Sequence, residues 1–243
     1  MDKATRKIDS DTVSFVAPRS TRRPLPGRHT LPREFIVRHQ RARITTALAE
    51  EVSAKGYRSV AVGDIVKRAG IARNTFYENF RSKEDCFLAV QEQATSAALE
   101  RVVAAAGAFE SWPEQVHAGL AAFLDYVVAE PALARACIVE GVSAGPAAAR
   151  YYEESQQPFV SLFRLGRAVS ARGAELPETL EEAVVGGVFW IVYQRLSLGE
   201  VEAIPGLLPE LLEFTLAPYL GPQQAREIAD SRDAAGGEAS PRS

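Results

Sequence analysis

The chain has 243 residues, of which 47% are hydrophobic and 24% charged, a composition typical of soluble globular proteins and unlike that of disordered ones. Its longest apolar run, over residues 183–193, is about half as long as a bilayer crossing requires, and the first thirty residues hold no apolar signal segment. The net charge of −3 divides unevenly, because residues 1–85 carry 18 basic against 10 acidic side chains (+8) and residues 86–243 carry 10 against 21 (−11). We therefore expect a cytoplasmic protein with a polyanion-binding head and no membrane contact.

The sequence contains no pattern typical of catalytic or metal chemistry. Its two cysteines, Cys86 and Cys137, are not at zinc-ligand spacing and cannot form a disulfide framework. The three histidines are far apart and have no carboxylate partner at a motif spacing. We find no convergent set of polar residues after residue 86. We therefore expect no catalytic residues, no metal and no cofactor, and a protein that is not an enzyme.

Residues 1–33 combine four prolines with several arginines and little apolar content. Proline lacks an N–H donor and fixes φ, so this stretch is not expected to be helical. It is predicted to be a flexible basic arm. Within it, Arg28 and Arg33 are candidates for insertion into a DNA minor groove, and a plain linker is the alternative.

Helical periodicity starts near residue 34. Apolar residues from Ile44 to Val52 predict a first helix that ends at Gly56. A second helix is expected over about 62–69, then a tight turn at Gly70, and then a third helix over about 73–80. Two short helices joined by a glycine turn are typical of a helix-turn-helix.

The second of these short helices has the chemistry of a DNA-reading element. Arg73 and Asn74 open it, and arginine pairs with guanine while asparagine pairs with adenine in the major groove. Thr75, Tyr77 and Lys83 offer a hydroxyl, a phenol and a cation to phosphates. We therefore predict that these five residues contact DNA. Burial in the protein is the alternative for Tyr77, and a solvated surface charge is the alternative for Lys83.

A specific set of short motifs runs through residues 34–88. Its members are Gly56-Tyr57, Asp64-Ile65, Ala69-Gly70-Ile71, Thr75-Phe76-Tyr77, Phe80 and Ser82-Lys83-Glu84. This set resembles the tetracycline-repressor (TetR) family. The resemblance implies an all-α homodimer of about nine helices per subunit, with a three-helix DNA-binding domain over residues 34–85 and a helical ligand-binding and dimerisation domain over residues 86–220.

The chain departs from the family pattern at helix starts. Ala61 and Ala72 stand where the family usually has hydroxyl caps, and each lost cap costs about 0.5–2 kcal/mol. Asn74 replaces a small residue and adds hydrogen-bonding capacity where bases are read. Ser82, three residues before Asp85, is expected to cap a long fourth helix.

Aromatic residues are frequent on the helices that surround a ligand cavity in this family, although plain core is the alternative for them. Glu140 lies on an apolar stripe, and a solvent-facing turn is the expected explanation. The candidates for a ligand pocket are Phe123, Tyr126, Cys137, Tyr151, Phe159, Phe163, Trp190 and Tyr193.

Two glycines inside a predicted helix cost about 1 kcal/mol each and are tolerated where another backbone approaches closely. In the family the last two helices pack against their copies, so the predicted dimer residues are Val184, Gly186, Gly187, Leu212 and Leu216. Close packing within one subunit is the alternative. Residues 221–243 are rich in Gly, Ala, Ser and charge and are predicted to be a disordered tail.

The resemblance implies a bacterial, nucleoid-associated regulator. We expect a repressor that binds a near-palindromic double-stranded DNA operator as a homodimer and is released by a small, largely apolar effector. The alternative is a ligand-independent DNA-binding regulator controlled by a protein partner or by its own concentration. An empty or tightly filled C-terminal cavity would favour this alternative.

Overall fold

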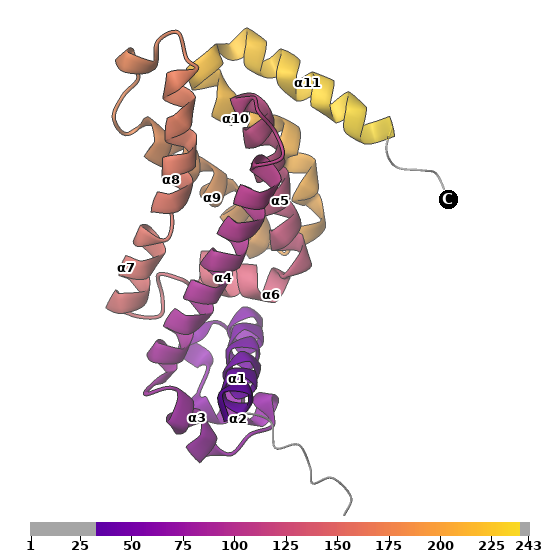
Figure 1. Cartoon of the computed structure of the whole chain (residues 1–243). Helices are drawn as coiled ribbons and strands as arrows, with labels where there is room; N and C mark the ends of the chain where they lie inside the picture. The colour runs from indigo at the N-terminus through magenta and orange to yellow at the C-terminus, as the bar shows by residue number, and fades with distance from the viewer. Residues whose placement is uncertain (1–32, 239–243) are drawn as a thin grey trace, which may run out of the picture.

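The computed structural model describes residues 33–238, and every regular element in this part of the chain is helical (Figure 1). The prediction of an all-α protein is confirmed there, and the division is finer than the nine helices expected. A π-helical turn, η2 (Arg135–Val139), follows the sixth helix. The α-helices are α1 (Arg33–Lys55), α2 (Val62–Ala69), α3 (Arg73–Asn79), α4 (Lys83–Ala106), α5 (Trp112–Ala129), α6 (Pro131–Ala134), α7 (Pro146–Glu154), α8 (Gln157–Arg164), α9 (Leu180–Leu198), α10 (Leu208–Leu220) and α11 (Pro222–Glu238).

The molecule has a small head and a larger body (Figure 1). In the head, α1, α2 and α3 enclose an apolar core centred on Ile44, Leu48, Ile65 and Phe76, all fully buried. In the body, α5 packs against both α4 and α10, and α8 packs against α9. The head is therefore built on three helices at one end of a helical body, and its core is shared with the first turns of α4.

The division between head and body does not fall at a linker. Helix α4 is 24 residues long, about 36 Å, and runs from the head into the body. Its first turns bury Phe87 and Val90 in the head core, and its later turns bury Ala98 and Val102 in the body core. The predicted boundary at residue 85 therefore lies inside a continuous helix, because one α-helix can present its successive turns to two cores.

The prediction of a disordered tail from residue 221 is wrong over residues 222–238, which form α11. Ala225 and Ala229 are buried against the body core, so small residues at helical spacing provide a packing face. The Arg226 guanidinium lies 2.8 Å from the carboxylate of Glu213 on α10 and also accounts for part of the attachment. Residues 239–243 lie outside the described residues.

Residues 1–32 of the predicted arm, including Arg28, also lie outside the described residues. Arg33, the last residue of the predicted arm, is the first residue of α1. The two arginines therefore remain predictions. Among residues 33–238, no helix is both long enough and apolar enough to span a bilayer.

Candidate DNA-binding surface and effector cavity

The turn between α2 and α3 holds two short helices in a fixed relation. Gly70 ends α2 in the left-handed conformation, with φ +62°, and its N–H donates to carbonyls in the last turn of α2. Left-handed backbone is cheap only for glycine. Ile65 of α2 and Phe76 of α3 are both fully buried beneath this turn. Local chemistry and packing thus define the predicted helix-turn-helix.

The outer face of α3 carries the side chains that were predicted to read DNA. Arg73 and Asn74 are exposed, and the Tyr77 side chain is 48% exposed. The Arg73 guanidinium lies 5.8 Å from the Tyr77 ring centroid, and its nitrogen is 3.4 Å from the Tyr77 hydroxyl. Thr75 is half-buried, and its backbone carbonyl accepts a hydrogen bond from the Asn79 amide. The most accessible predicted contacts are therefore Arg73, Asn74 and Tyr77.

The Asp64 carboxylate compensates in part for the missing cap at Ala61. Neither Ala61 nor Ala72 makes a side-chain cap, as expected. The Asp64 carboxylate accepts a hydrogen bond from the Ala61 N–H at 2.8 Å and pairs with Lys55 of α1 at 2.9 Å. Ser82 caps α4 by accepting from the Asp85 N–H at 3.0 Å, which confirms that prediction.

Lys83 has a different environment from the one predicted. Its ammonium donates to the backbone carbonyls of Tyr57 and Val60, at 2.8 and 2.7 Å, and lies 4.0 Å from the centroid of the Tyr57 ring. Burial lowers the pKa of this ammonium. The sequence predicts a solvent-facing cation available for phosphate. The structure instead gives Lys83 an internal role, joining the start of α4 to the turn after α1.

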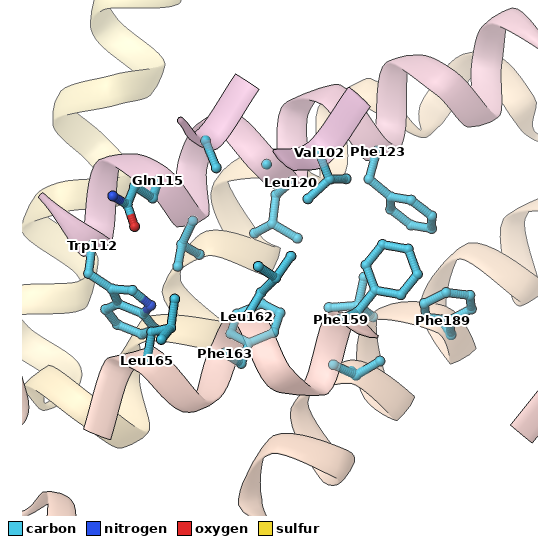
Figure 2. Close-up of a pocket in the computed structure, with 15 residues that line it drawn as sticks. Val102, Trp112, Gln115, Leu120, Phe123, Phe159, Leu162, Phe163, Leu165 and Phe189 are labelled. Atoms are coloured by element: carbon cyan, nitrogen blue, oxygen red, sulfur yellow. The ribbon is translucent and has the colours of Figure 1, made fainter. Parts of the chain in front are cut away.

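An apolar chamber lies in the body between α4, α5, α8 and α9 (Figure 2). The empty space between its lining atoms is about 640 Å³, a figure that includes open solvent, and the enclosed cavity volume is about 80 Å³. Trp112 and Leu165 lie at one end of Figure 2, and Phe123, Phe159 and Phe189 lie at the other. Gln115 is the one polar side chain among its described lining residues. We call this space the long chamber.

A second, smaller chamber adjoins the long one and lies nearer the head. Both chambers are lined by Phe123, Phe159 and Phe189, whose ring centroids are 5.3–6.2 Å apart. The wall of the second chamber also includes Gln91 and Tyr126, which are polar. Burial raises the pKa of the Tyr126 hydroxyl to about 12. The two spaces therefore adjoin at this aromatic cluster, and the first is almost entirely apolar while the second is partly polar.

The Trp112 end of the long chamber is held by a buried ion pair. The Glu181 carboxylate is fully buried and accepts from Arg167 at 2.7 and 3.0 Å and from the Tyr219 hydroxyl at 3.2 Å. The Tyr219 ring packs edge-on against Trp112, with centroids 4.8 Å apart. At Gly166, an added Cβ would lie 2.3 Å from the Trp112 indole. The backbone after α8 is therefore fixed against this indole.

The predicted pocket residues divide into two groups. Phe123, Phe159 and Phe163 line the long chamber, and Tyr126 and Cys137 line the second one. Tyr151, Trp190 and Tyr193 line neither chamber, so their assignment is wrong for this cavity. Trp190 is 57% exposed and stacks on Tyr193, because α9 turns its opposite face, with Val188 and Val192, toward the core. Residues that were missed include Trp112, Leu120 and Phe189, of which the first two follow the helical spacing of α5.

The structure also corrects the predicted dimer residues. Val184, Leu212 and Leu216 are buried within the subunit and present no free surface. At Gly187, an added Cβ would lie 2.8 Å from the Phe214 ring of α10, so this glycine permits close packing within one subunit, which was the alternative. Gly186 has open space around it.

Two polar contacts join the head to the segment beside the second chamber. The Arg135 guanidinium, in η2, donates to the backbone carbonyls of Ser53 in α1 at 3.1 Å and of Leu196 in α9. The Glu140 carboxylate, just after η2, accepts from the Tyr57 N–H at 3.0 Å. The same turn carries Cys137, which lines the second chamber. One short segment therefore touches both the cavity and the head.

The short helices, their glycine turn and the exposed polar face of α3 are those of a helix-turn-helix DNA-binding protein. Residues 44–90 match the family model described as "Bacterial regulatory proteins, tetR family". The head of this chain therefore carries the DNA-binding domain of the TetR family of transcriptional regulators.

Three relatives illustrate the likeness. The HTH-type transcriptional activator FasR of Mycolicibacterium smegmatis is 26% identical over 121 residues, which are 49% of this chain; the chain thus spans about half (53%) of that relative's length. The fatty acid degradation regulator FadR of Bacillus halodurans has a TM-score of 0.65 at 16% identity, over 74% of this chain and 94% of its own. FadR of Bacillus subtilis, solved in complex with stearoyl-CoA, has a TM-score of 0.61 at 15% identity, over 74% of this chain and 98% of its own. These structural likenesses extend the shared fold beyond the head.

Proposed function

We propose that this chain binds operator DNA as a dimer and that a small effector with a long apolar chain controls this binding. The observation that carries the proposal is the apolar long chamber in the body of a helix-turn-helix protein. An effector-independent regulator would need no such space. That a structurally similar regulator was solved with stearoyl-CoA supports an acyl chain as the class of occupant.

For DNA recognition we propose that α3 enters the major groove. Arg73 and Asn74 would read bases and Tyr77 would contact the backbone, since all three are exposed on one face. Arg58, in the turn before α2, and Arg81, between α3 and α4, are also exposed. We propose these two arginines as further phosphate contacts. Lys83 would support these contacts by holding the turn at Tyr57.

For dimerisation we propose the outer faces of α9 and α10. Trp190 is 57% exposed, Leu198 68% and Phe214 43%, although all three are large and apolar. Apolar side chains gathered on one face favour a protein contact. A symmetric dimer through these helices would place two heads on a near-palindromic operator.

For coupling we propose that the effector acts through η2. This turn lines the second chamber through Cys137 and holds the head through Arg135, with Glu140 following it. An occupant that changes the position of η2 would change the orientation of the head. The size of the effect is limited by the difference in effector affinity between the two orientations.

Repression is the proposed sign of regulation, with release by the effector. Operator sequences selected from random DNA by the full-length dimer would be used to measure operator affinity with and without stearoyl-CoA and shorter acyl-CoAs. Lower operator affinity in the presence of at least one of them supports the proposal. Unchanged operator affinity, together with no binding of any chain to the protein, would favour the effector-independent alternative.

A further inference from the structure

Two buried polar atoms, on residues that line the second chamber, have no partner among the described residues. They are the side-chain oxygen of Gln91 and the hydroxyl of Tyr126. Gln91 is 2% exposed and Tyr126 is 5% exposed, and both line the same space. A buried polar group without a hydrogen bond is costly, and native proteins rarely retain one without a reason. Two of them in one chamber point to a ligand group that pairs with both.

The geometry of Gln91 determines what this ligand group must offer. The Gln91 amide nitrogen donates to the backbone carbonyl of Ala148 at 3.4 Å, and this contact assigns nitrogen and oxygen within the amide. The atom without a partner is therefore the oxygen, which can only accept. The Tyr126 hydroxyl can donate or accept. The complementary group must donate one hydrogen bond, to Gln91, and can accept another, from Tyr126.

The chamber favours an uncharged ligand group. None of the described residues that line it is Asp, Glu, Lys or Arg, so nothing there would compensate a buried charge. Burial raises the pKa of both the Tyr126 hydroxyl and the Cys137 thiol to about 12, which shows that the surroundings disfavour ionised groups. A carboxylate would be doubly unsuitable, because it has no hydrogen-bond donor.

The long chamber supplies room for the rest of the molecule. It shares the Phe123, Phe159 and Phe189 wall with the second chamber and is almost entirely apolar. From Trp112 to Tyr126 the cavity follows α5 for fourteen residues, about 21 Å. This length suits an extended aliphatic chain.

We propose that the effector is an aliphatic molecule with a neutral hydroxyl or amide group that donates to Gln91 and accepts from Tyr126, while its apolar chain fills the long chamber. This proposal rests on the proposed function and narrows its effector class. It predicts that a chain that only accepts hydrogen bonds binds poorly.

Four probes of similar chain length test the hydrogen-bond requirement. Decan-1-ol and decanamide both donate and accept, 1-methoxynonane only accepts, and decanoate is charged and has no donor. Dissociation constants can be measured through the fluorescence of Trp112, which lines the long chamber, with calorimetry as a second readout. The alcohol and the amide should bind about tenfold or more tightly than the ether and decanoate, because those two leave the Gln91 oxygen unpaired.

Three variants test which side chains impose the hydrogen-bond requirement on the ligand. Gln91→Met should remove the preference for decan-1-ol over 1-methoxynonane, and Tyr126→Phe should weaken decan-1-ol binding while leaving the melting temperature unchanged or higher, since an unpaired hydroxyl is lost. Ser155→Ala is the matched control, because Ser155 lines the same chamber but its hydroxyl already donates to the Tyr152 carbonyl at 2.8 Å. It should keep the wild-type preference.

The outcomes separate this proposal from the proposed function. Equal binding of all four probes, unaffected by Gln91→Met, would overturn the assignment of the polar pair and indicate that water satisfies these atoms, while an apolar effector would still stand. Selective binding of the alcohol without any change in operator affinity would support the polar pair and contradict the proposed control of DNA binding. Binding of none of the probes would overturn the polar-pair proposal.

Discussion

The Glu140 carboxylate accepts a hydrogen bond from the Tyr57 N–H at 3.0 Å, across 83 positions of sequence. Tyr57 lies in the turn between α1 and α2, and Glu140 directly follows the π-helical turn that borders the second chamber. The carboxylate also lies 3.5 Å from the position a Cβ would take on Gly56. The contact thus links the helix-turn-helix head to the segment beside the second chamber through a half-buried polar pair.

Replacing Glu140 should weaken this link. Glu140→Ala leaves the Tyr57 N–H without its partner and should lower the free energy of unfolding by about 1–3 kcal/mol. It should also reduce the effect of an effector on operator affinity, measured as the ratio of dissociation constants with and without effector. Glu140→Gln retains an acceptor oxygen and is the control. Equal coupling in Glu140→Ala and the wild type would contradict this role.

Lys83 should contribute to stability more than to DNA affinity. Lys83→Met keeps the aliphatic stem but removes both hydrogen bonds to the carbonyls of Tyr57 and Val60. Urea unfolding should show a loss of about 1–3 kcal/mol, and the salt dependence of operator binding should keep its slope. Arg81→Ala, at an exposed position, should instead make this slope shallower by about one unit. The opposite pattern would restore Lys83 as the phosphate contact.

Asn74 should carry sequence preference. Its amide is exposed at the start of α3 and can pair with adenine. Asn74→Ala should cost about 1–3 kcal/mol on the preferred operator and much less on an operator changed at one base pair. Dissociation constants for both operators, with both proteins, give the comparison. A uniform loss on both operators would assign Asn74 to backbone contact.

The head could be predicted from the sequence because its structure depends on local signals. The glycine turn at Gly70, the buried positions Ile65 and Phe76 and the cap at Ser82 are all read from neighbouring residues. The role of Lys83 could not be read in this way, since its partners lie 23 and 26 positions away. A lysine at a helix start has the same local pattern whether its ammonium faces solvent or backbone carbonyls.

The cavity was only partly predictable for a similar reason. Helical spacing identifies one apolar face of α5 but does not distinguish which aromatic on α9 faces inward. The sequence therefore predicts Trp190 and Tyr193 in the pocket, whereas the structure shows that Phe189 of the same helix lines it. Glu140 gave a usable signal, an acidic residue on an apolar stripe, but its partner Tyr57 is not identifiable from spacing.

The ion pair of Glu181 and Arg167 should make the free energy of unfolding depend on pH in the acidic range. Burial alone would raise the pKa of Glu181, but the hydrogen bonds and charge of Arg167 outweigh it and lower this pKa from 4.5. The pair therefore stabilises the folded state above about pH 4.5, and this contribution is lost as the pH falls through the lowered folded pKa. The free energy of unfolding, measured between pH 7 and pH 3, should decrease below about pH 4.5.

Glu181→Gln isolates this contribution. It leaves the Arg167 guanidinium without its anion and should lower the free energy of unfolding at pH 7, with a flatter loss below pH 4.5. Glu175→Gln is the matched control, because Glu175 pairs with Arg172 at 2.9 Å in an exposed position, where ion pairs contribute little. Equal costs for the two variants would show that the buried pair is not a determinant of stability.

Trp190 offers a sharper test of dimerisation than Gly187, because a side chain at Gly187 would collide with Phe214 of the same subunit. Trp190→Glu places a charge on the exposed face of α9 without disturbing the core, since the indole is 57% exposed. If this face forms the dimer, light scattering should show monomers, circular dichroism should show an unchanged helical content, and operator affinity should fall because two linked heads are no longer available. Val103→Glu, at an apolar position of α4 that is 49% exposed, is the matched control and should remain dimeric. A Trp190→Glu protein that keeps the wild-type dimer at micromolar concentration would place the interface elsewhere.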